Sequence, residues 1–385
     1  MKTKHFFLAI FAAVLLVFTS CEEETPTPVE VTSGILPAKF KVDIPNSLSN
    51  SNFTNVGLKS AENDTITGGA IYQNLNYFIA IGEEAADITE AIISHIALYK
   101  IQSVLELTYT SDDDNRVKKL LVESEVEFEN RTWEYMLTIS DLESEGNADG
   151  GKGMQVFWNN DPVEGIALLK PYNIDRVHDA DAGDAAFSIE YSSKGNEKYD
   201  EYMIVEIVDF PKDPTNADIF AVDNIKMFVG KNGNIVDVYG NSNHPNAKFN
   251  THSEVSGFNW AFVASGKQTE DIAVAEVGLP YSSLDSDSRE MILVENSIKS
   301  VLSREMSDFI ITEYAAIGIT LQPEEVVAYL APYLTNADAP GYFNTNGFIQ
   351  GGTSPSGAYS VLESNVLELT PYNPKEISEL AISFK

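Results

Sequence analysis

Two hydrophobic periods follow each other along the chain, and the first is helical over residues 68–100. Apolar residues recur there at intervals of three and four, which is the spacing of an amphipathic helix. They are Leu75, Phe78, Ile79, Ala85, Ile88, Ile92, Ile93, Ile96 and Tyr99. Glu83, Glu84, Asp87 and Glu90 lie mainly off this stripe. The pattern predicts one long helix with an apolar face.

From Leu105 to about Gly278 the period changes to two, which is typical of half-buried β-strands. Phe258, Trp260 and Phe262, for example, fall on one face of a predicted strand. Roughly ten such segments follow one another, and no helical pattern between them is long enough for a parallel crossover. We therefore expect a long antiparallel meander, which has to curl or close to protect its edges.

Turn residues and strands that are apolar on both faces add detail to the predicted meander. Asn232-Gly233 lies between the apolar segments Ile225–Val229 and Ile235–Tyr239, which predicts a tight hairpin. Residues 201–208 are apolar on both sides. We expect that one face of such strands meets helices, or that the other lines a cavity.

Helical spacing returns after residue 285. Residues 286–316 predict a helix capped by Ser286 or Ser288, and Pro323 is expected to begin a shorter one. Residues 341–357 are rich in loop-forming types. The expected fold is α+β: a large antiparallel meander, curved or barrel-like, flanked by N- and C-terminal helices. The expected segments are a leader (1–20), a tether with a loosely built segment (21–68), a helix-plus-meander domain (69–285), and a helical and loop region that packs on the sheet (286–385).

The first residues have the order of a secretory signal peptide. Lys2 and Lys4 precede the apolar run Phe6–Phe18, and two small residues stand just before Cys21. This run is shorter than the about 20 residues that a membrane span needs. Cys21 is the only cysteine of the chain, so no intramolecular disulfide is expected and the core has to hold the fold.

The tetrapeptide Phe18-Thr19-Ser20-Cys21 resembles the lipobox of bacterial lipoproteins, although Phe18 stands where the lipobox favours Leu. The resemblance implies that Cys21 becomes the first residue and carries lipid. The flank "CEEETPTPVEVTSG" is similar to the acidic export signal of surface-exposed lipoproteins of Bacteroidota. That similarity implies an outer-membrane location facing the cell exterior, and a solvated linker is the alternative. Its Pro- and Thr-rich composition predicts an extended tether.

Charge narrows the classes of partner. The chain has 25 basic and 58 acidic residues, a net charge of −33, and without residues 1–20 the balance is 23 − 58 = −35. Nucleic acid is not an expected partner, because its phosphates are bound by clustered Lys and Arg. We expect contact with the membrane only through the lipid on Cys21. The remaining candidates are a glycan, a small apolar ligand and an envelope protein.

An acidic loop offers the one candidate metal site. Asp179, Asp181, Asp184 and Glu190 have offsets that resemble a calcium loop, in which hard oxygens surround the ion. Gly183 stands at position five of this loop rather than six. A solvated loop is the alternative, and Ca²⁺ is the only cofactor considered. Residues 111–116, "SDDDNR", are expected to form a hairpin turn.

Tryptophans beside amides form the candidate ligand site. Trp158 precedes Asn159 and Asn160, and Trp260 lies on another predicted strand. Aromatic faces flanked by amides stack on sugar rings and other flat ligands. The alternative is that these tryptophans belong to the core of the sheet.

The sequence has no motif for a catalytic nucleophile, a zinc hydrolase or a phosphate loop: GxSxG, HExxH and GxxxxGK[ST] are all absent. We therefore expect a non-enzymatic binding protein of the envelope, with a glycan or another nutrient as ligand. A carrier of lipid or another apolar ligand, with a cavity between sheet and helices, is the first alternative. A hydrolase that uses paired carboxylates is the second.

Overall fold

The computed structural model describes residues 37, 39–49, 67–97, 104–179, 182–211, 220–250 and 256–385. The predicted leader, the predicted lipidation site at Cys21 and the candidate calcium ligand Asp181 lie outside the described residues. Contacts divide the chain into two units. The first comprises Met1–Val42, Glu83–Pro211 and Ala381–Lys385, and the second comprises Asp43–Gly82 and Lys212–Leu380. The division falls inside the expected 69–285 segment, between the seventh and eighth strands.

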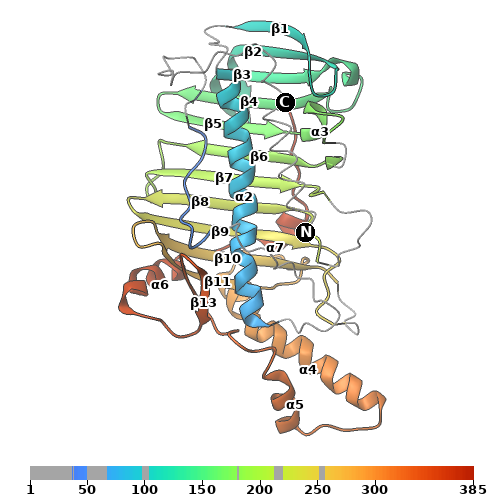
Figure 1. Cartoon of the computed structure of the whole chain (residues 1–385), viewed down its shortest axis with the longest axis vertical. Helices are drawn as coiled ribbons and strands as arrows, with labels where there is room; N and C mark the ends of the chain where they lie inside the picture. The colour runs from blue at the N-terminus through green and yellow to red at the C-terminus, as the bar shows by residue number, and fades with distance from the viewer. Residues whose placement is uncertain are drawn as a thin grey trace. The chain divides into compact units, whose positions relative to one another are not determined.

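The described strands form one antiparallel sheet of thirteen members, whose order in space is their order along the chain (Figure 1). The first unit holds β1 (Leu105–Thr110), β2 (Val117–Phe128), β3 (Arg131–Asp141), β4 (Lys152–Asn160), β5 (Val163–Leu169), β6 (Ala186–Ser192) and β7 (Glu201–Val208). The second holds β8 (Ile225–Asn232), β9 (Ile235–His244), β10 (Phe258–Lys267), β11 (Ile272–Gly278), β12 (Gly341–Asn344) and β13 (Gly347–Gly351). The predicted α+β fold with an antiparallel meander is confirmed, and the sheet is open rather than barrel-like.

Local turn chemistry explains this up-and-down order. In the β8–β9 hairpin, Asn232 pairs with Ile235, so Gly233 and Asn234 form a two-residue turn. Gly233 has a φ of 55°, which suits the left-handed first position of such a turn. The predicted hairpin is confirmed. Residues 341–351, expected as loop, form the short hairpin β12–β13 instead, and Phe343 at its centre is fully buried.

The two faces of the sheet in the first unit are both covered. On one face the ring of Phe40 lies over Gly165, and its centroid is 6.0 Å from that of Tyr191. A Cβ at Gly165 would stand 2.9 Å from the Phe40 ring, so only glycine allows this approach. On the opposite face, Ile382 and Phe384 pack against a buried cluster. It consists of Val126, Trp133, Met136, Phe157, Ile166 and Leu168.

Both faces are also covered in the second unit. Phe258, Trp260 and Phe262 share one face of β10, as predicted, and the ring of Phe78 lies 5.0 Å from that of Trp260. Ala261 and Val263 point to the other face. There they join a buried cluster with Val274, Ile292, Leu293, Tyr342, Tyr359, Leu362, Val366 and Leu369. Two-sided burial explains why several strands are apolar at nearly every position.

The helix α2 (Gly68–Ala97) confirms the predicted long helix within the described residues and runs unbroken through Gly82. Its buried surface is wider than one stripe, since Tyr72, Ala80, Ile81 and Ala86 are buried as well. A helix that is apolar on most sides has to be covered on most sides. Two of its acidic residues serve this packing: Asp87 pairs with Lys41, and Glu90 accepts a hydrogen bond from the backbone of Phe40.

The C-terminal region contains one longer helix, α4 (Ile298–Ala316), and the shorter helices α5 (Pro323–Leu330), α6 (Ser360–Leu367) and α7 (Pro374–Ser378). The first unit contains one further short helix, α3 (Pro171–Ile174). The helix predicted over residues 286–316 is interrupted. A π-helical turn, Glu290–Val294, follows Ser288, whose hydroxyl accepts a hydrogen bond from the Met291 amide at 3.4 Å. α4 itself is capped by Ser297, next to Asn296, whose carbonyl accepts from the Leu279 amide at 2.7 Å. α5 begins at Pro323, as predicted.

Among the described residues, no helix is both long enough and apolar enough to span a membrane.

Candidate functional site

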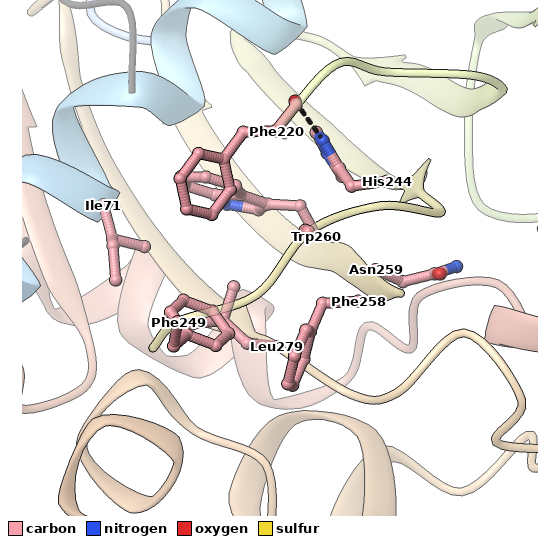
Figure 2. A pocket seen from close by; sticks show the side chains of 9 residues that line it. Ile71, Phe220, His244, Phe249, Phe258, Asn259, Trp260 and Leu279 are labelled. Atoms are coloured by element: carbon pink, nitrogen blue, oxygen red, sulfur yellow. Dashed lines mark hydrogen bonds between the residues drawn. The ribbon is translucent and has the colours of Figure 1, made fainter. Parts of the chain in front are cut away.

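A small apolar pocket lies where β9 ends and β10 begins (Figure 2). Its lining comes from five separate parts of the second unit: α2, the segment before β8, the β9–β10 connection with its flanking strand ends, β10 itself and the end of β11. The residues are Ile71, Phe220, His244, Ala247, Phe249, Phe258, Asn259, Trp260 and Leu279. The enclosed space is about 20 Å³, which is room for about one water molecule.

The strand register places the pocket residues. Phe258 lies opposite His244 in the β9–β10 pair, and Trp260 lies opposite Ser242, so their side chains share one face of the sheet. Asn259, between them on β10, points to the other face. Its amide donates to the Pro374 carbonyl at 2.9 Å, and Figure 2 shows it directed away from the rings. The pocket is therefore aromatic because alternation selects every second residue of β10.

His244 fixes the upper wall of the pocket. Its Nδ1 lies 2.8 Å from the carbonyl oxygen of Phe220, the bond drawn dashed in Figure 2, and its Nε2 lies 2.9 Å from the Ser242 hydroxyl. This geometry corresponds to an imidazole that donates from Nδ1 and accepts at Nε2. Both ring nitrogens are engaged within the protein. His244 therefore positions Phe220, whose ring stands in front of Trp260 in Figure 2.

Trp260 supplies the unsatisfied polar group of this pocket. The side chain is 4% exposed, and its ring packs 5.0 Å from that of Phe78 and 6.3 Å from that of His244. Its Nε1–H is buried and finds no acceptor among the described residues. A buried donor without a partner costs about 1–3 kcal/mol, and native structures have few of them. The site thus combines apolar walls with one donor in need of an acceptor.

The other candidate ligand residues lie in the first unit and hold the sheet together there. Trp158 on β4 is fully buried and stacks on Tyr135 at 5.4 Å. The side chain of Asn159 accepts a hydrogen bond from the backbone N–H of Glu134 and donates one to the Glu164 carboxylate. The backbone N–H of Asn160 donates to the Glu134 carboxylate. Trp158 and Trp260 thus belong to different units, on strands that are not neighbours in the sheet.

The four candidate calcium ligands have separate surroundings where they are described. Asp179 is buried, and its Oδ1 has no hydrogen-bond partner in the described part of the chain. Asp184 is exposed and pairs with Lys170 at 3.3 Å, and Glu190 on β6 pairs with Arg131 at 2.8 Å. Asp181 lies outside the described residues. Within those residues, no group of three or more His, Cys, Asp and Glu side chains is placed to hold a metal ion. Calcium binding stays a prediction.

Asp179 borders a buried ionic cluster, which we define as Asp114, Arg116, Lys118, Asp141 and Arg176. Lys118 is 2% exposed, and its Nζ lies 2.8 Å from Asp114 and 3.5 Å from Asp141. Arg116 binds both carboxylate oxygens of Asp141, at 2.6 and 3.2 Å. Burial alone would raise the pKa of Asp141, but the hydrogen bond from Arg116 and the charge of Lys118 hold it below its ordinary value.

Beside the ionic cluster, two carboxyls bind protons more tightly than usual. Burial, reinforced by the neighbouring charge of Asp175, raises the pKa of Asp179 to about 7 and that of Asp113 to about 6. Asp175 itself accepts a hydrogen bond from Nδ1 of His178 at 2.6 Å, which raises the pKa of His178. The hydrogen bonds of the Asp113 and Asp175 carboxylates run to residues two or three positions away in the same loop, Ser111 for the first and Val177 and His178 for the second.

Sequence reasoning identified few of these residues. Trp260 was singled out, but the other pocket residues come from segments that only the fold brings together. Lys118 carries a detectable signal, because it is in phase with the buried Leu120 and Val122 on β2. Comparison with known proteins adds no further assignment: no family model, no curated protein and no solved structure matches this chain.

Proposed function

We propose that this chain is a lipid-anchored lipoprotein of the bacterial outer membrane, exposed at the cell surface, whose body binds a small and largely apolar ligand without converting it. The binding role rests on one observation, the buried indole N–H of Trp260, which lines an apolar pocket and has no acceptor among the described residues. A ligand with an apolar ring or chain end and one hydrogen-bond acceptor would satisfy this donor.

The size of the pocket favours this ligand over a whole lipid. The space of about 20 Å³ takes about one water molecule as it stands, so a ring-sized ligand enters only if the side chains of the walls move, and a whole lipid would need a far larger movement. Stacking on a glycan is less favoured, because Trp133, Trp158 and Trp260 are at most 4% exposed and offer no open ring face. Of the binding roles that the sequence suggested, the apolar ligand is the one that the pocket supports best.

The anchor is supported by the lipobox-like sequence around Cys21, and metabolic labelling tests it. Cells that express the chain are grown with labelled palmitate and compared with cells that express Cys21→Ala. We expect label on the wild type alone. Equal labelling of the two proteins would contradict lipidation. Protease treatment of intact cells then distinguishes the outer face of the membrane, where the body is cleaved, from the inner face, where it is protected.

The pocket is tested with two probes of similar shape, acetophenone, which has a carbonyl acceptor, and ethylbenzene, which has none. We expect the wild type to bind acetophenone more tightly, by roughly five-fold or more, because one buried donor gains its partner. Trp260→Phe should lose this preference, since it keeps a ring but no donor. Trp158→Phe is the matched control and should keep it. No saturable binding, or a preference that survives in Trp260→Phe, would sink the proposed pocket.

A further inference from the structure

The helices α4 and α5 form a hairpin, residues 298–334, that extends away from the strands of the second unit (Figure 1). Met306, Ile310 and Leu330 hold the hairpin together as a small buried core. Other large apolar side chains of the hairpin face solvent, with exposures between 44% and 70%. They are Ile311, Ile317, Ile319, Val327 and Tyr329. Tyr329 also contacts α4, since its ring lies 5.0 Å from that of Tyr314. Ile311, Ile317, Ile319 and Val327 lie outside the buried core of the hairpin.

The charge of this region is one-sided. Residues 305–374 contain no Lys, Arg or His, whereas 25 basic residues in 385 would average between four and five in such a stretch of 70. The same residues include eight acidic side chains, and five of these lie on the hairpin. One is the buried Glu305, and the other four are Asp308, Glu313, Glu324 and Glu325. Lys299 and Arg304 lie in the first two turns of α4, and from residue 305 onward the hairpin presents exposed apolar side chains among charged side chains that are all acidic.

We propose that the α4–α5 hairpin docks a protein partner whose contact surface has apolar side chains flanked by Lys and Arg. Several large apolar side chains exposed on one short segment are a feature of interaction sites, and acidic neighbours favour a partner with basic ones. A second copy of the chain would bring like charges together. An anionic membrane is equally disfavoured, because helices that lie on such membranes have basic polar faces.

The probe is a fluorescent helical peptide with leucines on one face and lysines on the other, titrated into the purified full chain and followed by anisotropy. We expect saturable binding that weakens with salt and a loss of affinity of roughly ten-fold or more in Ile317→Ser/Val327→Ser. The matched control is Leu105→Ser/Leu107→Ser, which removes exposed apolar side chains of β1 and should change the affinity less than about two-fold. The same peptide with Glu in place of Lys should not bind.

Cross-linking locates the bound peptide independently of folding effects. A photoreactive residue at Val327 should capture the lysine peptide, and the same residue at Leu107 should not. The proposal is overturned by equal affinity of the wild type and the hairpin variant, or by capture at Leu107 alone. It is also overturned if the hairpin variant abolishes self-association in sedimentation or binding to anionic vesicles, because the occupant would then be a second copy or a membrane.

Discussion

Three buried polar side chains show how surroundings decide the fate of a single residue. Lys118 has two carboxylates within 3.5 Å, Asp179 has a carboxylate oxygen with no partner among the described residues, and Trp260 has a donor with no acceptor among them. The charge of Lys118 is compensated, burial raises the pKa of Asp179 to about 7, and the Trp260 donor is the group to which the proposed ligand would bind. Each case leads to a different measurable behaviour.

Lys118→Met should destabilise the protein strongly. The substitution keeps the length of the side chain but leaves Asp114 and Asp141 buried without its charge, which costs about 3–5 kcal/mol for a buried pair. Urea unfolding of the variant and the wild type measures the difference. The adjacent Lys119→Met is the matched control and should have a much smaller effect, because Lys119 and its partner Glu106 are solvent-exposed. Equal losses for the two variants would contradict the importance of the buried pair.

Asp179→Asn should stabilise the protein at pH 8 and not at pH 3. The folded-state pKa of about 7 lies above the ordinary value of 3.8, so the folded state binds the extra proton between these two pH values. Stability from this group is complete in acid and is lost as the pH rises through about 7. Asn removes that loss, which is worth about 2–4 kcal/mol. Unfolding at several pH values measures it, and a difference that does not vary with pH would refute the assignment.

At the scale of helices and strands, an element can be predicted from the sequence when the interactions that form it lie between neighbouring residues. The apolar spacing of residues 68–97 and the turn at Gly233 are properties of neighbouring residues, and both were predicted correctly. The break between the π-helical turn Glu290–Val294 and α4 was not predicted. At this break the Leu279 amide donates to the Asn296 carbonyl, and the periodicity of residues 286–316 carries no information on that contact. The strands β12 and β13 were not predicted either, because β12 pairs with β11, which is distant in the sequence.

The packing of α6 gives a prediction at this scale. Leu362 is fully buried in the cluster that covers Ala261 and Val263, whereas the adjacent Val361 is 59% exposed. Leu362→Ala should therefore lower the free energy of unfolding by about 2–5 kcal/mol. Val361→Ala should change it by less than about 0.5 kcal/mol. Calorimetry or urea titration compares the two variants, and similar losses would mean that α6 does not pack as described.

At the scale of the molecule, the open meander distributes its possible sites over distant segments. The pocket joins residues between Ile71 and Leu279, and the ionic cluster joins three loops of the first unit. Such sites have no sequence motif. Only single unusual residues could be recognised from the sequence, such as a lysine at a buried position of β2 or a tryptophan on β10. The acidic balance follows from composition, whereas the exposed apolar side chains of the α4–α5 hairpin were not predicted, since residues 286–385 were expected to pack on the sheet.

The most direct measurement of the proposed binding role is the ¹⁵N–¹H spectrum of the tryptophan indoles. The chain has three tryptophans, and Trp260→Phe assigns the relevant signal by its disappearance. Addition of acetophenone should move the Trp260 Nε1–H signal downfield, as expected when a donor gains a hydrogen bond, and leave those of Trp133 and Trp158 in place. A Trp260 signal that stays unchanged at saturating acetophenone would contradict the account.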